Sequence, residues 1–180
     1  KGRGGALKRV WLKSDADILC YMDADLSTDL DAFPTLLEAV TSGGHDIAAG
    51  SRLLKPEWTT RCWKREVASR CYNALVKTTL RTRFSDAQCG FKAITRRTAQ
   101  HLLPLIEDTG WFFDTELLVI AERLDYRIFD LPVHWVEGRE SHVNIFRTAI
   151  DDLRGILRLR RRFQNGLPRL GKSSGHATEA

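Results

Sequence analysis

The sequence has no long apolar stretch and few cysteines. No run approaches the roughly 18 apolar residues that a helix needs to cross a bilayer, so we expect a soluble or peripheral domain. The four cysteines, at positions 20, 62, 71 and 89, lack the close pairs of a zinc site. This cysteine usage favours a reducing, intracellular setting.

The sequence also lacks a strong excess of charge of one sign. Its formal charge is +5 over 180 residues, and the arginines recur along the whole chain. Such a distribution suits ligands that carry phosphate groups, and we expect no nucleic acid partner. No signal peptide is visible, and residue 1 is Lys rather than Met, which is compatible with a start inside a longer protein.

Short apolar runs alternate with amphipathic segments, which is the pattern of an α/β domain. The run "ADILCYMD" predicts a strand buried on both faces in a parallel sheet, and "HDIAAGSR" predicts the next strand. "RIFDLPVHWVE" alternates and contains Pro132, which indicates an edge strand. The other predicted elements are a strand in "CGFKAITRR" and helices near 26–40, 61–79, 98–106, 114–124 and 143–162.

Two of the predicted helices are long and amphipathic. The helix near 61–79 carries one apolar stripe, formed by Trp63, Val67, Cys71, Ala74, Leu75 and Thr78. The helix near 143–162 has one apolar face and ends in "RLRRRF". Two interpretations of this last helix stay open: a core-facing helix with a solvated basic end, or a helix that lies on an anionic membrane surface.

Two aspartates, Asp23 and Asp25, follow the first apolar run directly. Ligands of open α/β sheets collect at the carboxyl ends of strands, and hard carboxylate oxygens suit Mg²⁺ or Mn²⁺. The spacing therefore favours a divalent metal site. An EF-hand is excluded, because its sixth position would be Thr28 rather than Gly and its twelfth Pro34 rather than Glu.

A structural alternative remains open for the same segment. Asp25, Ser27 and Asp29 could simply cap the following helix by accepting hydrogen bonds from its first N–H groups. Capping accounts for Ser27 and Asp29 but leaves Asp23 unexplained. A pair of buried carboxylates needs a compensating cation, arginine or helix N-terminus, so the partner of Asp23 separates the two interpretations.

Four segments, in this order, resemble family 2 glycosyltransferases that load a sugar onto a polyprenyl phosphate. They are "YMDADLS", "AAGSRL", "RFSDAQCGFKAITRRTA" and "WFFDTELLVIAERLDYRIFDLPVHWVE". "DAQCGFK" and "FFDTELL" look most like the dolichyl-phosphate glucosyltransferase branch, with the dolichyl-phosphate mannose synthases as near neighbours. The similarity covers about residues 1 to 160.

The resemblance implies a nucleotide-diphosphosugar transferase fold, which is Rossmann-like and of the GT-A type. It makes Asp23 and Asp25 the Asp-x-Asp motif that binds Mg²⁺ or Mn²⁺ on the donor diphosphate, with Ser27 as a further ligand. Arg52 and Arg65 match positions that meet donor or acceptor phosphate. We expect Arg65 to act in catalysis and Arg52 in substrate binding.

The resemblance also implies residues around the reacting sugar. Asp86 matches a motif position near that sugar and is the expected catalytic carboxylate, with Gln88 beside it in substrate binding. Asp114 and Glu116 match an acidic segment that borders the site, and Asp114 is the expected substrate ligand. Where the family has Gly-Ser-Lys, this chain has "GRESHV", so Arg139 (or His142) is expected to replace that lysine.

The family pattern also predicts what the chain is part of. Family members begin with two strands that clasp the nucleotide, whereas this sequence begins with "KGRGGALK", so we expect an N-terminally incomplete fold. The expected transferase domain covers 1–163 and a disordered tail covers 164–180. The expected activity is inverting transfer of a hexose, with glucose favoured, from a nucleoside diphosphate sugar to polyprenyl or dolichyl phosphate at the cytoplasmic face of a membrane. The alternatives are transfer of mannose or another sugar, and an inactive fragment that acts as a basic membrane-associating module.

Overall fold

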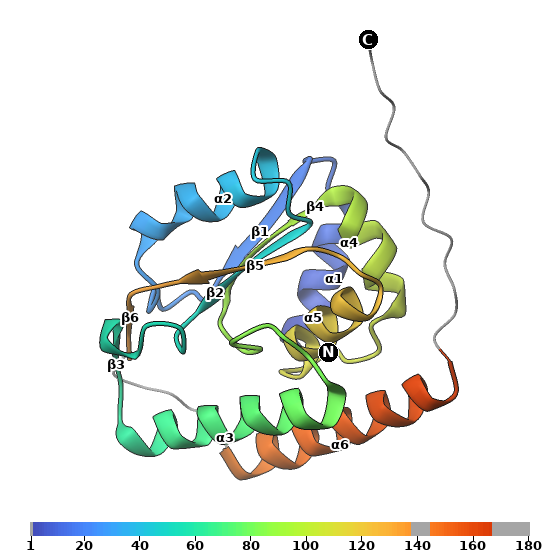
Figure 1. The fold of residues 1–180 in the computed structure, drawn as a ribbon. Helices are drawn as coiled ribbons and strands as arrows, with labels where there is room; N and C mark the ends of the chain where they lie inside the picture. Colours follow the sequence, from blue (N-terminus) through green and yellow to red (C-terminus); the bar gives the residue numbers. More distant parts are fainter. Residues whose placement is uncertain (1, 138–144, 167–180) are drawn as a thin grey trace.

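A central four-stranded sheet organises the chain (Figure 1). The computed structural model describes residues 2–137 and 145–166. The strands are β1 (Ile18–Met22), β2 (Ile47–Ser51), β4 (Phe91–Thr95) and β5 (Ile128–Pro132), in the spatial order β1-β4-β2-β5. Short strands β3 (Thr59–Thr60) and β6 (Trp135–Val136) form a separate parallel pair. The α/β class predicted from the sequence is confirmed.

The sheet is mixed, and this corrects the prediction of a wholly parallel sheet around the first strand. β4 pairs antiparallel with both β1 and β2, while β2 and β5 are parallel. β1 is also less buried than predicted: Leu19 is buried, but its neighbours on the strand are only half-buried. The reason is its position, because β1 lies at an edge of the described sheet and has β4 on one side only.

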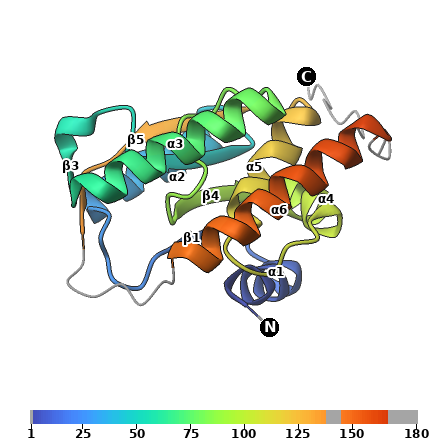
Figure 2. The same ribbon diagram turned by 90° about the horizontal axis from the view of Figure 1, so that it is seen from below.

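Helices cover both faces of the sheet. On one face α2 (Phe33–Thr41) packs against β2 and β4 (Figure 1). The other face is covered by α1 (Arg3–Lys13), α4 (Arg96–Leu102) and α5 (Phe113–Arg123). Seen from below, α3 (Trp63–Leu80) and α6 (Ile145–Gln164) run side by side as an outer layer (Figure 2). Short 3-10 helices η1 (Leu30–Ala32), η2 (Pro56–Trp58) and η3 (Leu103–Leu105) complete the described elements.

Two hydrophobic cores hold these layers together. The smaller one lies under α2 and joins Leu36 to Phe91 and Ala93 of β4. The larger one lies on the other face and joins Ile94 of β4 to Trp11 of α1 and to α5. Alternation along β4 therefore supplies both cores, because successive side chains of a strand point to opposite faces.

Helix α1 was not predicted, because "KGRGG" contains three glycines and glycine disfavours a helix interior by roughly 1 kcal/mol relative to alanine. The structure explains Gly4: a Cβ there would lie 2.4 Å from Cβ of Phe113. The close approach of α1 to α5 depends on this missing side chain. Packing has overridden local propensity at this position.

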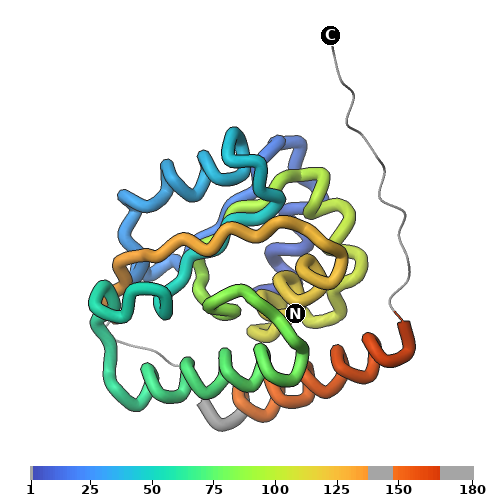
Figure 3. Tube along the Cα trace, in the orientation of Figure 1, coloured from blue at the N-terminus to red at the C-terminus, as the bar shows by residue number. Residues whose placement is uncertain are grey.

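The later elements agree with their predicted places, with three differences. The helix near 26–40 begins later than predicted, as η1 and then α2. The alternating segment near 127–137 forms two strands, and the chain continues from β5 toward the β3–β6 pair (Figure 3). The stripe of six residues on α3 is exposed to solvent rather than buried; the buried side chains of that helix are Asn73, Val76 and Leu80.

Residues 138–144 and 167–180 lie outside the described residues. These ranges include Arg139, His142 and most of the predicted tail. The domain boundary at 163 stays a prediction. Within the described parts of the chain, no helix combines the length and the apolar character that crossing a bilayer requires.

Candidate active site

Asp23 stands at the carboxyl end of β1, as predicted. Its backbone N–H donates to the Gly90 carbonyl oxygen at 2.9 Å, which ties the strand end to the loop before β4. Its carboxylate Oδ1 accepts a hydrogen bond from Nη2 of Arg3 at 3.0 Å. Arg3 is thus the compensating partner of Asp23 in this structure, and it comes from the start of α1.

Arg3 joins Asp23 to a second predicted residue, Asp114. Its Nη1 donates to Oδ2 of Asp114 at 2.6 Å. Asp114 is buried at the start of α5, and its other oxygen lies 3.2 Å from Nζ of Lys92 and accepts a hydrogen bond from the Tyr21 hydroxyl. Two carboxylates that are 91 positions apart in the sequence therefore meet one guanidinium.

Lys92 is fully buried on β4, opposite Tyr21 of β1. Besides Asp114, its ammonium donates to the carbonyl oxygen of Cys89 at 2.5 Å. A buried ammonium is tolerated only when it is paired and hydrogen-bonded. Lys92 therefore adds a second positive charge, besides Arg3, that compensates the buried carboxylate of Asp114.

A second buried ion pair joins Arg52, just after β2, to Asp86. Nε and Nη2 of Arg52 donate to the two carboxylate oxygens of Asp86 at 2.7 and 2.9 Å, and the Arg52 backbone N–H adds a third bond at 3.2 Å. Burial alone would raise the pKa of Asp86, but the Arg52 guanidinium outweighs it and lowers the pKa to about 2. Arg52 also lies over the ring of Trp135, 5.6 Å from its centroid.

These contacts show that Asp86 fixes the position of the Arg52 side chain. The residue is fully buried and both carboxylate oxygens accept from Arg52, so in this arrangement Asp86 does not present a free oxygen to a ligand. Gln88 extends the same group: its backbone N–H donates to Asp86 at 3.1 Å, and its side chain donates to Asp152 of α6 at 2.9 Å. Direct contact of Asp86 or Gln88 with a sugar stays a prediction.

In the acidic loop after β1, one residue caps a helix and the others keep oxygen atoms that a metal ion could bind. Asp29 caps η1 by accepting from the backbone N–H of Asp31, as the capping interpretation predicts. Asp25 accepts from the backbone N–H of Ser27 at 3.1 Å. Ser27 caps nothing: its Oγ is buried and has no hydrogen-bond partner among the described residues.

The oxygen atoms of this loop fit a divalent cation whose remaining ligands come from a bound phosphate. Asp23 and Asp25 offer two carboxylates, and the unpartnered Ser27 hydroxyl offers a third hard oxygen. Within residues 2–137 and 145–166 no group of three or more His, Cys, Asp or Glu side chains could hold a metal alone. Magnesium-type sites often have only one or two carboxylates and are completed by water and substrate phosphates, so the two observations agree.

Arg65 lies apart from these groups, in the first turn of α3. Its Nη1 pairs with Glu137 at 2.7 Å, next to the β3–β6 pair. The structure therefore does not bring Arg65 into contact with Asp86 or Asp23. Its catalytic assignment stays a prediction, as does the role of Arg139, which lies outside the described residues.

Comparison with known proteins identifies the family. A model described as "Glycosyl transferase family 2" matches residues 1–103, which is more than half of the chain. This chain belongs to glycosyl transferase family 2. The family predicted from the four motifs is confirmed.

Curated relatives of this family 2 chain include enzymes named for lipid-linked sugar transfer. It is 42% identical over 157 residues to "Glycosyltransferase AglD" of Haloferax volcanii, covering 87% of this chain and 25% of that protein. It is 30% identical over 173 residues to "Dolichyl-phosphate beta-glucosyltransferase" of Dictyostelium discoideum, covering 93% of this chain and 53% of that protein. The chain thus spans between a quarter and about half of the length of these relatives.

Solved structures show that the fold is the nucleotide-sugar transferase fold of the GT-A type. Glucosyl-3-phosphoglycerate synthase from Mycobacterium tuberculosis in complex with UDP superposes with a TM-score of 0.64 at 20% identity, over 89% of this chain and 56% of that one. The same enzyme with Mn²⁺ and UDP-glucose gives a TM-score of 0.59 at 18% identity, over 86% and 54%. The predicted fold class is confirmed.

The sequence did not single out four residues that contact the predicted site residues Asp23, Asp114 or Gln88: Arg3, Tyr21, Lys92 and Asp152. Lys92 and Asp152 carry a usable signal, because each is a single charge on an otherwise apolar strand or helix face. Arg3 and Tyr21 carry none. Arg3 is one of many arginines, and only the tertiary fold brings it beside Asp23.

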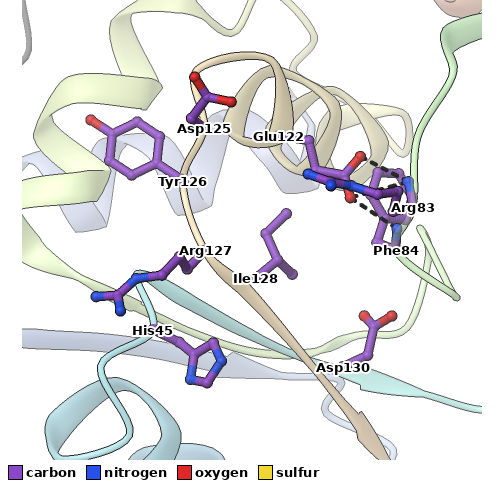
Figure 4. Close-up of a pocket in the computed structure, with 9 residues that line it drawn as sticks. All are labelled: His45, Arg83, Phe84, Glu122, Asp125, Tyr126, Arg127, Ile128 and Asp130. Carbon is purple, nitrogen blue, oxygen red and sulfur yellow. Dashed lines mark hydrogen bonds between the residues drawn. The ribbon is translucent and has the colours of Figure 1, made fainter.

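A cavity of about 370 Å³ lies elsewhere on the family 2 domain (Figure 4). It is lined by the end of α5 and the start of β5, including Glu122 and Asp130, and by none of the predicted site residues. The carboxylate of Glu122 accepts hydrogen bonds from the backbone N–H groups of Arg83 and Phe84 (Figure 4). This contact fixes the loop after α3 and indicates a structural role.

Proposed function

We propose that this chain carries the catalytic site of an inverting, metal-dependent hexosyltransferase. The donor is a nucleoside diphosphate sugar, with UDP-glucose favoured, and the acceptor is a polyprenyl or dolichyl phosphate. Relatives named dolichyl-phosphate beta-glucosyltransferase support the acceptor class and the sugar. A structural neighbour crystallised with Mn²⁺ and UDP-glucose supports the donor and the metal.

One observation in this chain carries the proposal: an acidic strand end lies beside two buried cation–carboxylate groups. Asp23 and Asp114 both pair with Arg3. Burial lowers the pKa of Arg52, but Asp86 raises it and Asp23 adds to that rise, so the Arg52–Asp86 pair lies within electrostatic reach of Asp23. Oxygen ligands for a cation and guanidinium groups for phosphate are the two chemistries that a diphosphate leaving group requires.

Asp23, Asp25 and Ser27 would hold the metal. When bound, Mg²⁺ or Mn²⁺ supplies Lewis-acid stabilisation of the charge that develops on the departing diphosphate. Arg3 pairs with Oδ1 of Asp23 in this structure, so the charge of this carboxylate is compensated.

The remaining residues bind and orient. Asp86 holds Arg52 in a fixed plane that suits a phosphate group, and Arg65 and Arg139 are the proposed contacts of the acceptor phosphate. A lipid phosphate already carries a charge of about −1.5 to −2 near neutral pH, so the reaction needs no strong general base. Catalysis then consists mainly of positioning and electrostatic stabilisation.

A transfer assay tests the proposed function. The protein is incubated with Mn²⁺, dolichyl phosphate and either UDP-glucose or GDP-mannose, and the lipid product is measured. We expect a glucolipid from UDP-glucose. A clear preference for GDP-mannose would overturn the choice of donor, and no glycolipid with any common donor would end the proposal in favour of a non-catalytic module.

Gly90 provides a substitution that acts on the metal site without touching a ligand. A Cβ at residue 90 would lie 1.9 Å from Oδ2 of Asp23, so Gly90→Ala must displace that carboxylate. We expect at least a tenfold loss of Mn²⁺-dependent UDP binding by calorimetry and a stability loss of about 1–3 kcal/mol.

Gly110→Ala is the matched control for Gly90→Ala. Its added Cβ would meet Oδ1 of Asp108 at 3.4 Å, an ordinary contact, so nucleotide binding should stay at the wild-type value. If Gly90→Ala binds nucleotide as tightly as Gly110→Ala does, Asp23 is not a metal ligand.

We also propose that the protein lies on the cytoplasmic face of a membrane through α3 and α6. The two helices form the underside of the molecule (Figure 2) and together define the α3–α6 face. Its exposed apolar side chains are Trp63, Val67 and Leu75 of α3 and Ile150, Leu153 and Leu157 of α6. Exposed cations among the described side chains of these helices are Lys64, Arg70, Arg154, Arg160 and Arg161. An apolar face rimmed by cations is the pattern of helices that lie in an anionic membrane interface.

Removing apolar side chains from the α3–α6 face should weaken membrane binding. Trp63 is 68% exposed, so Trp63→Ser with Val67→Ser should leave folding intact. We expect at least about a tenfold loss of binding to vesicles that contain phosphatidylserine, because two apolar side chains contribute more than about 1.4 kcal/mol. Flotation measures the bound fraction.

Val10→Ser is the control for this experiment, since Val10 is comparably exposed but lies on α1. It should float as the wild type does. Equal loss in both variants, or no loss in the double variant, would contradict the membrane assignment of the α3–α6 face.

A further inference from the structure

Helix α6 places a buried carboxylate, Asp152, against the site. Among the described side chains of α6 it is the buried charged group, whereas its neighbour Asp151 is exposed. Oδ2 of Asp152 accepts a hydrogen bond from Nε2 of Gln88 at 2.9 Å. Oδ1 is buried and finds no partner in the described part of the chain. A half-satisfied buried carboxylate costs stability, so a packing role alone does not explain this residue.

From Gln88 a continuous series of hydrogen bonds reaches Arg52. The backbone N–H of Gln88 donates to Oδ1 of Asp86 at 3.1 Å, and the same oxygen accepts from Nη2 of Arg52 at 2.9 Å. The route from Asp152 to Arg52 therefore consists of three hydrogen bonds and two intervening residues. It links α6 to the arginine that follows β2.

Helix α6 is seated firmly enough to serve as the fixed end of this series. Gly155, one turn after Asp152, approaches Phe112 so closely that a Cβ would lie 2.5 Å from its ring. Arg158 donates to the fully buried Glu116 of α5 at 2.8 Å. Close packing and an ion pair to a buried carboxylate set the position of the helix, and with it the position of Asp152.

The charge of Asp152 changes within an ordinary pH range. Burial raises its pKa to about 6, with the Gln88 hydrogen bond opposing that rise and the carboxylates of Asp108 and Asp151 adding to it. The nearby groups on other elements include Tyr72 of α3, whose pKa is raised by burial and raised further by the charge of Asp152. A carboxylate accepts a stronger hydrogen bond than a carboxylic acid does, so Gln88 is held more firmly above pH 6 than below it.

We propose that Asp152 is a positioning residue that acts through Gln88 to set the place of the Arg52–Asp86 ion pair. It thereby ties a phosphate-binding arginine to a helix of the α3–α6 face. The effect on catalysis rests on the proposed function, whereas the coupling from Asp152 to Arg52 is a property of the chain itself and can be measured without any substrate.

Nuclear magnetic resonance of the 180-residue chain tests this coupling. The Arg52 Nε–Hε and Gln88 Nε2–H₂ signals are followed from pH 4.5 to 8, together with the Asp152 side-chain carbon. In the wild type we expect all three to change with one midpoint near pH 6. Asp152→Asn keeps the size and an acceptor oxygen but cannot titrate, so the midpoint should vanish from Arg52 and Gln88.

Two further variants distinguish coupling through the hydrogen bonds from a general structural effect. Asp151→Asn removes a neighbouring charge at an exposed position, so the Arg52 midpoint should persist and shift slightly downward together with that of Asp152. Gln88→Ala removes the side-chain link, so Arg52 should lose its midpoint while Asp152 still titrates. A wild-type Arg52 signal without the midpoint, or a midpoint that survives in Gln88→Ala, would overturn the proposal. Neither result depends on glycosyl transfer, which the donor assay tests separately.

Discussion

Asp114→Ala is expected to lower the free energy of unfolding by about 3–5 kcal/mol, the cost of leaving a buried charge unpaired. The substitution removes the carboxylate that meets both Arg3 and Lys92. Lys92 is fully buried and would keep only carbonyl and hydroxyl partners from its present contacts. Urea unfolding at pH 7 measures the loss.

Asp17→Ala is the matched control, because Asp17 also pairs with an arginine, Arg96, at 3.0 Å but is 89% exposed. Its loss should stay below about 1 kcal/mol, as for other surface ion pairs. Adding Lys92→Met to Asp114→Ala should recover part of the stability, since it removes the unpaired ammonium. If Asp114→Ala costs no more than Asp17→Ala, the buried charge group does not support the fold.

Asp86→Asn is expected to cost about 3 kcal/mol or more at pH 7, because it leaves the Arg52 guanidinium buried without a charge partner. The effect should depend on pH. The native pKa of Asp86 is lowered from 3.8 to about 2, so its stabilisation is present above pH 4 and is lost as the pH falls toward 2. The shift corresponds to about 2 kcal/mol.

The free energies of unfolding of the wild type and Asp86→Asn should therefore approach each other as the pH is lowered from 5 toward 2. The double variant Asp86→Asn with Arg52→Met serves as the control, because it has no buried unpaired charge and should be more stable than Asp86→Asn alone. A difference between wild type and Asp86→Asn that stays constant with pH would show that Asp86 does not carry its charge in the Arg52 pair.

Much of the fold could be predicted from the sequence, because its elements have strong local signals. The runs around Leu19, Ile47 and Phe91 are short and apolar, and they form β1, β2 and β4. What the sequence does not contain is the neighbour of each strand. β4 lies between β1 and β2 and runs against both, and no periodicity in a strand reports the direction of its partner.

The face of a helix that meets the core was equally hidden. The stripe on α3 that includes Trp63 and Val67 has helical spacing, so the helix was predicted correctly, but the stripe faces solvent. Periodicity shows that one face differs from the other and does not show which one the rest of the protein covers. An exposed apolar face is an observation that only the structure supplies.

The candidate site was predicted in part for the same reason. Asp23 and Asp25 stand at a strand end, which the local pattern shows. Arg3 contacts Asp23 and Asp114, which lie 20 and 111 positions away in the sequence. Lys92 contacts Asp114 from β4. Such contacts depend on the tertiary fold, so only resemblance brought Asp114 into the predicted site, and nothing in the sequence singled out Arg3.

The central claim is that Asp23 belongs to a metal and diphosphate site, whereas Asp29 is only a helix cap. Thermal unfolding of the wild type, Asp23→Asn and Asp29→Ala, with and without Mn²⁺ plus UDP-glucose, tests it directly. We expect the ligands to raise the melting temperature of the wild type. Asp23→Asn should fold but lose this rise, because it removes a charged oxygen ligand and keeps the side-chain shape.

Asp29→Ala should behave in the opposite way. Losing the cap of η1 costs about 0.5–2 kcal/mol, so the variant should melt earlier than the wild type without ligands and keep the full ligand-induced rise. If Asp23→Asn instead keeps the full rise in melting temperature with Mn²⁺ and UDP-glucose, Asp23 does not bind the metal, and the mechanism proposed for this chain is wrong.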